Sequence, residues 1–166
     1  MPLLRRFAML SPLCTPNQWW LFLRVLTFAT AVPLLFNLRL SVLSRLLERR
    51  IRSARQRGDD SINSNQIIRC VEIVRAVGQP LVRPQCLIRA VTLYYFLRRA
   101  GMDLNLCFGA ARKEGRLVEA AGHCWLVKDG EPYLEERDPR ASFLPIYCLP
   151  NSWTEAEDRT HVPAIT

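Results

Sequence analysis

Two short stretches contain residue types that could together perform nucleophilic catalysis. In the first, Cys86 follows Pro84 and opens a segment whose apolar residues repeat at helical spacing. In the second, His123 begins an apolar run, Gly122-His123-Cys124-Trp125-Leu126-Val127, that has the character of a strand. Backbone N–H groups at a helix start stabilise a thiolate and can hold an oxyanion, and a histidine nearby can serve as general base and acid. Each residue alone has a more ordinary explanation, a buried thiol or a hydrogen-bonded core histidine. The hypothesis of a nucleophilic site therefore rests on the two residues together.

The third member of such a site would be an acid that orients the imidazole. If Lys128-Asp129-Gly130 is a three-residue hairpin loop, Val127 pairs with Glu131 and His123 lies opposite Glu135. A two-residue Asp129-Gly130 turn would place Glu136 there instead, because a one-residue slip changes the face to which a side chain points. We favour Glu135 and keep Glu136 and Asp138 as alternatives.

The rest of the chain must supply the elements that position these residues. Apolar spacing and turn residues predict helices over 16–31, 34–56, 64–77 and 86–100, then strands over 104–108, 123–127 and 133–135. Helices first and an antiparallel sheet afterwards define an α+β fold. We expect a hydrophobic, arginine-rich helical segment over 1–60, a catalytic domain over 61–150 and a tail over 151–166.

Composition restricts the classes of protein that fit. With 166 residues, 49% of them hydrophobic, the chain can form a folded core. Its net charge of +8 indicates either an acidic partner (nucleic acid, an anionic membrane surface or an acidic peptide) or simply an arginine-rich composition. We expect no nucleic-acid partner. Arg24 and Pro33 interrupt the N-terminal apolar run, which argues against a membrane span but leaves membrane-surface contact open. We therefore expect a cytoplasmic protein, either free or peripheral at the inner membrane surface.

The six cysteines show no close CxxC pair and no regular spacing. Most of them are expected to be reduced thiols buried as small hydrophobic side chains. A zinc site from Cys86, His123 and Cys124 is disfavoured, because successive strand residues point to opposite faces. We expect neither a metal nor a cofactor.

Taken in order, these residues resemble a known family. The motifs Pro84-Gln85-Cys86-Leu87-Ile88-Arg89-Ala90, Leu97-Arg98-Arg99-Ala100-Gly101, His123-Cys124-Trp125 and Asp129-Gly130-Glu131-Pro132 are similar to those of the lasso-peptide leader peptidases. These are transglutaminase-like cysteine proteases. The resemblance covers roughly residues 65–145, with a Cys-to-His spacing of 37 and a His-to-acid spacing of 12. The N-terminal helices suit the stand-alone form of the family, which has no fused recognition domain.

The resemblance implies both a fold and an activity. The fold would be a transglutaminase-like or papain-like core, in which the helix that carries the nucleophile packs on an antiparallel sheet. Cys86 would be the nucleophile, His123 the base and Glu135 the acid, acting on the leader region of a precursor peptide. A separate leader-recognition protein would be a partner, and the ring-closing synthetase could be another. Alternatives are an acyl transferase of the same fold and a non-catalytic adaptor for peptide or membrane.

Three positions depart from the family pattern. Glu135 stands where aspartate is usual, Cys124 where alanine is usual and Ile88 where proline is common. The acid is therefore one methylene longer than the usual one, and the start of the helix is less sharply defined.

Overall fold

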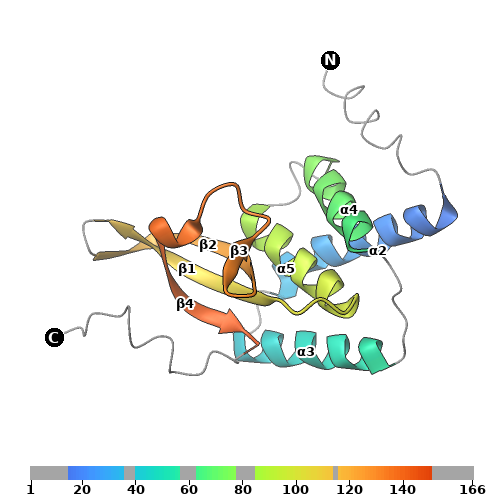
Figure 1. The fold of residues 1–166 in the computed structure, drawn as a ribbon, viewed down its shortest axis with the longest axis horizontal. Coiled ribbons are helices and arrows are strands. Elements are labelled where there is room, and N and C mark those ends of the chain that lie inside the picture. The colour runs from blue at the N-terminus through green and yellow to red at the C-terminus, as the bar shows by residue number, and fades with distance from the viewer. Residues whose placement is uncertain (1–14, 36–39, 57–62, 78–84, 114–115, 151–166) are drawn as a thin grey trace, which may run out of the picture. The chain divides into compact units, whose positions relative to one another are not determined.

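The computed structural model describes residues 15–35, 40–56, 63–77, 85–113 and 116–150 (Figure 1). The described elements are α2 (Pro16–Leu35), α3 (Leu40–Gln56), α4 (Ser64–Val77), α5 (Gln85–Arg99), β1 (Asn105–Lys113), β2 (Arg116–Lys128), β3 (Glu131–Tyr133), the short 3₁₀ helix η1 (Pro139–Ala141) and β4 (Phe143–Leu149). They fall into two compact units, one helical and one built of strands, which divide after Leu104. The predicted segment boundaries at residues 60 and 150 stay a prediction, and the predicted tail lies outside the described residues.

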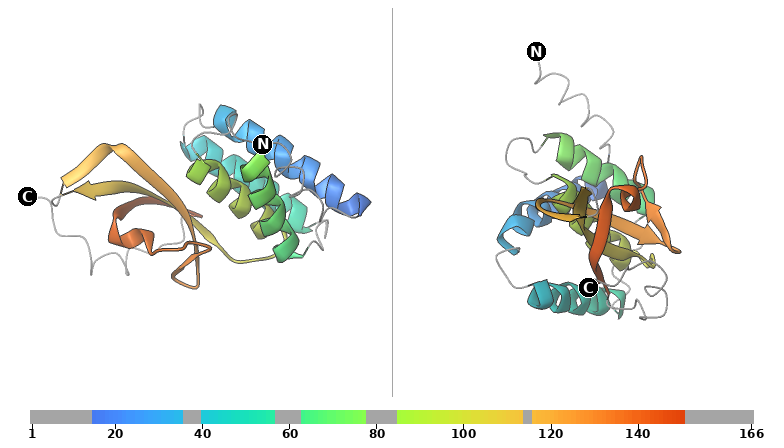
Figure 2. Two further views of the ribbon diagram at one scale, coloured as in Figure 1. Left: turned by 90° about the horizontal axis from the view of Figure 1, so that it is seen from above. Right: turned by 90° about the vertical axis from the view of Figure 1, so that its left-hand side faces the viewer.

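The helical unit contains α2 to α5, with α2 and α4 on one side of α5 and α3 on the other (Figures 1 and 2). Each helix turns an apolar face inward, and the largest fully buried side chains of the unit come from all four. They include Val25 and Val32 of α2, Leu43 and Ile51 of α3, Ile67 of α4, and Leu93, Tyr94 and Leu97 of α5. Burial of such faces is what holds short helices together in water.

The helix boundaries agree with the predicted ones except near Pro33. The predicted break before residue 34 is wrong, because α2 continues through Pro33 to Leu35. Pro33 stands in the last turn of α2, where the missing N–H removes only one hydrogen bond near the helix end. The helix predicted over 34–56 begins at Leu40 in the structure.

Helices α4 and α5 have boundaries close to the predicted ones, and local residues explain the start of α4 and the end of α5. The side chain of Asn63 accepts a hydrogen bond from the N–H of Asn65 at 2.9 Å and caps the start of α4. Gly101 ends α5 with a positive φ of 95°, a conformation that glycine adopts without steric cost. Gly78 and the residues between Pro80 and Pro84 lie outside the described residues.

The strand unit is a four-stranded antiparallel sheet in the order β3-β2-β1-β4. Strands β1 and β2 are longer than predicted, and β4 was not predicted at all. Pro145 interrupts the pattern of β4, but β4 is an edge strand and tolerates a proline. A bulge between β1 and β4 places Phe108 opposite Tyr147 and Gly109 opposite Pro145, leaving Ile146 exposed between the two pairs.

One pair of cysteines departs from the expected reduced state. Cys107 of β1 and Cys148 of β4 are directly opposite each other, with Cα atoms 4.2 Å apart, and the structure joins them as a disulfide. Such a short Cα separation is that of a non-hydrogen-bonded antiparallel pair. The disulfide packs with Trp125, Val127 and Phe143 on one face of the sheet. The pairing could not be foreseen because it depends on the unpredicted strand β4.

No helix in the described part of the chain combines the length and the apolar character that a membrane span requires.

Candidate active site

Cys86 is the second residue of α5 and therefore lies in its first turn. The backbone N–H groups of a first helical turn have no partner within the helix, so they are available to an anion. Among the described cysteines with a free thiol, Cys86 is partly exposed whereas Cys70 and Cys124 are buried. Burial also raises the pKa of Cys70, although the nearby charge of Arg69 opposes the shift. Cys86 is thus the described thiol best placed to meet a substrate.

An ion-pair network fixes the first half of α5 against α4. Arg89 lies one turn after Cys86, and its Nε donates to Glu72 of α4 at 2.7 Å. Arg75 donates to the other oxygen of Glu72 at 2.8 Å. Burial raises the pKa of Glu72, but the hydrogen bonds and charges of Arg89 and Arg75 outweigh burial and leave this pKa below its ordinary value. The helix that carries Cys86 therefore has a charged anchor close to its start.

His123 lies in β2 with its ring against two aromatic side chains. The ring stacks on Trp125 with centroids 6.0 Å apart and contacts Phe143 of β4 at 5.1 Å. Its side chain is 23% exposed, so one part of the ring reaches solvent while the rest is packed. These contacts leave the imidazole few alternative orientations.

The residue opposite His123 on β1 is Gly109, and the absence of its side chain is a packing requirement. A Cβ at this position would lie 2.7 Å from two ring atoms of Trp125 and 3.0 Å from the carbonyl oxygen of Leu144. Only glycine lets the Trp125 ring lie over β1 and support His123. Gly109 was not among the predicted site residues, although a glycine inside a strand is the signal that could have indicated close packing.

Glu135 is the acid that contacts His123. Its Oε2 lies 3.3 Å from His123 Nε2, and its side chain is 14% exposed. When the Glu135 carboxylate is ionised it can only accept, and the hydrogen shared with it is then the one on Nε2. In the neutral imidazole Nδ1 then carries the lone pair and can receive a proton from an attacking group.

The contact between His123 and Glu135 was predicted, but the register that led to it is wrong. The hairpin has a two-residue turn, with Lys128 opposite Glu131 and Val127 opposite Pro132. Asp129 and Gly130 both have positive φ, 53° and 83°, as a type I′ turn requires. Continued pairing in this register would have brought Glu136 opposite His123.

Leu134 is the reason why Glu135 reaches His123 instead. Strand β3 ends at Tyr133, and Leu134 adopts a left-handed conformation with φ of 62°. This conformation is unusual for a non-glycine residue and interrupts the alternation of an extended chain. Glu135 therefore leaves the predicted strand and turns toward the imidazole. No sequence signal marks this residue, since glycine or asparagine would be expected at such a φ.

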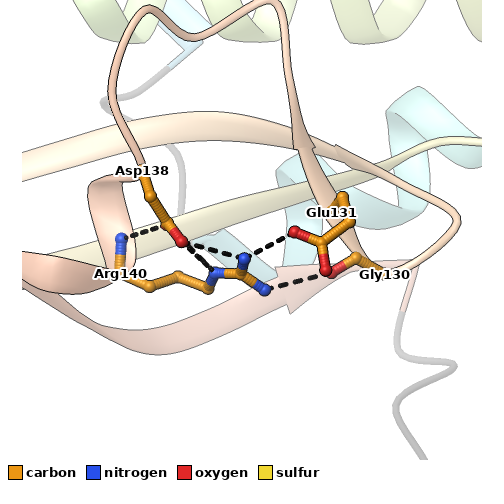
Figure 3. A network of polar contacts seen from close by, with 4 residues as sticks. All are labelled: Gly130, Glu131, Asp138 and Arg140. Carbon is orange, nitrogen blue, oxygen red and sulfur yellow. Dashed lines mark hydrogen bonds and ion pairs between the residues drawn. The ribbon is translucent and has the colours of Figure 1, made fainter.

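The two alternative acids have other surroundings. Asp138 caps η1 by accepting from the N–H of Arg140 at 2.9 Å, and both of its carboxylate oxygens bind the Arg140 guanidinium (Figure 3). Arg140 in turn donates to Glu131 and to the carbonyl of Gly130, closing the network over the hairpin turn (Figure 3). Hydrogen bonding to Arg140 holds the pKa of Asp138 below its usual range, although slight burial opposes it. Glu136 is exposed.

The structure thus brings His123 and Glu135 together in the strand unit, while Cys86 lies in the helical unit. The pairing of Cys86 with His123 would join the two units, and it stays a prediction.

The family model of the transglutaminase-like superfamily matches residues 30–148. The match covers most of the chain, so the protein belongs to the transglutaminase-like superfamily, whose members are typically cysteine peptidases or acyl transferases. The predicted α+β fold of transglutaminase type is confirmed. No curated protein and no solved structure gives a significant match.

Proposed function

We propose that this protein is a cysteine peptidase that removes the leader from a ribosomally made lasso-peptide precursor. The observation that carries the proposal is the contact between His123 and Glu135, which gives a transglutaminase-like chain an oriented imidazole. The partly exposed Cys86 in the first turn of α5 supplies the nucleophile. The motifs around these residues supply the resemblance to the leader peptidases.

In the proposed acylation step, His123 Nδ1 takes the proton of the Cys86 thiol, and Sγ attacks the carbonyl carbon of the leader–core amide. Glu135 keeps the Nε2–H in place and stabilises the imidazolium that forms. Backbone N–H groups at the start of α5 stabilise the oxyanion. When the C–N bond breaks, the imidazolium gives its proton to the leaving amine, and a thioester remains.

Hydrolysis completes the proposed cycle. His123 accepts a proton from water, the resulting hydroxide attacks the thioester carbonyl, and the leader leaves as a carboxylic acid. The proton on His123 returns to the Cys86 sulfur. No metal or cofactor takes part in these steps.

The test uses the full chain, a precursor peptide and a candidate leader-recognition protein, with product masses as the readout. We expect wild-type protein to give two fragments whose summed mass exceeds that of the precursor by one water. The Cys86→Ala variant should give no cleavage while still binding its partner. Retained cleavage by this variant would contradict the proposal.

A second candidate function is acyl transfer, which superfamily membership supports equally. A transferase would pass the acyl group from Cys86 to an amine rather than to water. The same mass measurement in the presence of a primary amine distinguishes the two, because the acyl fragment then carries the mass of the amine.

A further inference from the structure

The outer face of α3 is strongly basic and does not contribute to the core of the helical unit. The inner face of α3 is buried through Leu43, Leu47, Ile51 and Ala54. On the opposite side, Arg45, Arg49 and Arg52 follow one another at spacings of four and three residues, so they form one row along the helix. All three are exposed.

Two exposed aliphatic residues run beside this row. Val42 and Leu46 are spaced by one turn and are 41% and 45% exposed. Arg50 follows Leu46 by four residues and is also exposed, so the aliphatic pair has arginines on both sides. We call these six residues the α3 outer face: Val42, Arg45, Leu46, Arg49, Arg50 and Arg52.

The described residues of the helical unit do not neutralise these charges. Glu48 is the only acidic residue in α3, and it is turned toward α5, where it accepts from the Tyr94 hydroxyl and lies 3.6 Å from Arg98. Within the described part of the chain, no carboxylate forms an ion pair with an arginine of the α3 outer face. Arg55 differs from the arginines of the α3 outer face, because it donates to the carbonyl oxygens of Arg98 and Met102 and links α3 to the end of α5.

This arrangement costs stability rather than adding to it. Like charges at spacings of three or four residues repel each other and destabilise a helix. Arg45 with Arg49, and Arg49 with Arg52, are two such pairs. An anionic partner would relieve the repulsion, and arginine forks bind carboxylates in bidentate geometry.

From these observations we infer that the α3 outer face docks an acidic, amphipathic segment of a polypeptide partner. Glutamates or aspartates of the partner pair with Arg45, Arg49 and Arg52, while an apolar side chain of the partner rests on Val42 and Leu46. A lipid surface fits less well, since an interfacial helix inserts its apolar face and that face of α3 is already buried in the core. The inference does not depend on Cys86 chemistry and goes beyond the proposed peptidase activity.

The test measures fluorescence anisotropy of a labelled synthetic peptide of about 16 residues, a length close to that of α3. The peptide carries glutamates and leucines, each at helical spacing, so that it forms an acidic face beside an apolar one. We expect the Arg45→Glu/Arg49→Glu variant to weaken binding at least about tenfold, and wild-type affinity to fall as salt rises from about 50 to 300 mM. Val42→Ser/Leu46→Ser should weaken binding about threefold or more without a change in charge. Arg45→Gln/Arg49→Gln provides a milder variant, and thermal melts show that each variant is folded.

The matched control is Arg69→Glu/Arg137→Glu, which makes the same change in net charge at exposed arginines outside α3. It should retain binding within about twofold of wild type, and so should Cys86→Ala. Equal weakening by the control and by the α3 variant would overturn the inference, because binding would then reflect net charge alone. It would also be overturned if the α3 variant lost binding to phosphatidylglycerol vesicles but kept binding to the peptide. Retained peptide binding by Cys86→Ala together with lost cleavage separates this inference from the proposed function.

Discussion

Oε2 of Glu135 lies 3.3 Å from Nε2 of His123, although regular pairing of the hairpin would have brought Glu136 to that place. The left-handed Leu134 between β3 and Glu135 produces this result. A proton-transfer site in this protein would therefore depend on one unusual backbone conformation as well as on the residues that exchange protons.

Replacing Glu135 tests its role in orienting the imidazole. We expect Glu135→Gln to lower kcat/KM for leader cleavage by about 10²–10⁴-fold, because a neutral amide stabilises neither the required tautomer nor the imidazolium. Glu136→Gln and Asp138→Asn should each stay within about threefold of wild type. A larger loss in Glu136→Gln than in Glu135→Gln would contradict the assignment.

Leu134 offers a test of the backbone that positions Glu135. Leu134→Gly should keep most of the activity, since glycine adopts positive φ readily. Leu134→Pro should abolish activity, because proline fixes φ near about −65° and the chain could no longer turn Glu135 toward His123. Thermal melts of both variants distinguish a local loss of geometry from unfolding. Equal activity of the two variants would show that the conformation of Leu134 is not required.

Gly109 is predicted to limit the stability of the sheet. Gly109→Ala would place a methyl group against the Trp125 ring at a distance that real contacts do not show. We expect the free energy of unfolding to fall by about 1–3 kcal/mol, measured by urea denaturation. Gly130→Ala makes a comparison, because its Cβ would meet no atom of the described residues within 4 Å although φ is positive there. A smaller loss at Gly109 than at Gly130 would argue against the packing explanation.

Acid should weaken the link between α4 and α5. The pKa of Glu72 is lowered in the folded chain, so its contribution to stability is present above its unfolded pKa, near 4.5, and is lost as pH falls through the folded value. Because Glu72 is about one-third exposed, we expect this contribution to be only about 0.5 kcal/mol. Urea denaturation at pH 7 and pH 3 should show wild type more stable than Glu72→Gln at pH 7 and the difference reduced at pH 3. A difference that stays constant would contradict the pKa explanation.

Much of the helical unit could be predicted because its residues follow simple local rules. The apolar spacing of α4 and α5 and the terminating Gly101 correspond to a buried face and a left-handed helix end, both of which depend on nearby residues. Pro33 was misjudged because the cost of a proline depends on its distance from the helix end, which the sequence does not mark.

The strand unit was harder to predict because its geometry depends on partners distant in sequence. Strand β4 contains Pro145 and becomes recognisable only beside β1, and the Cys107–Cys148 disulfide follows from that pairing across 41 residues. The Asp129-Gly130 turn was predicted, but not its two-residue type, so the predicted register of the hairpin was wrong by one residue. The left-handed Leu134 nevertheless turns Glu135 toward His123. Glu135 was therefore predicted to contact His123, as it does, but from a pairing of β2 with β3 that differs from the observed one.

The most direct test of the proposed catalytic site asks whether His123 activates Cys86. Wild type and His123→Ala are treated with iodoacetamide near pH 7, and peptide mapping follows alkylation of each cysteine separately. We expect Cys86 to react at least about tenfold faster in wild type than in His123→Ala, while the buried Cys70 and Cys124 react slowly in both. Equal rates of Cys86 alkylation in the two proteins would show that His123 does not activate Cys86.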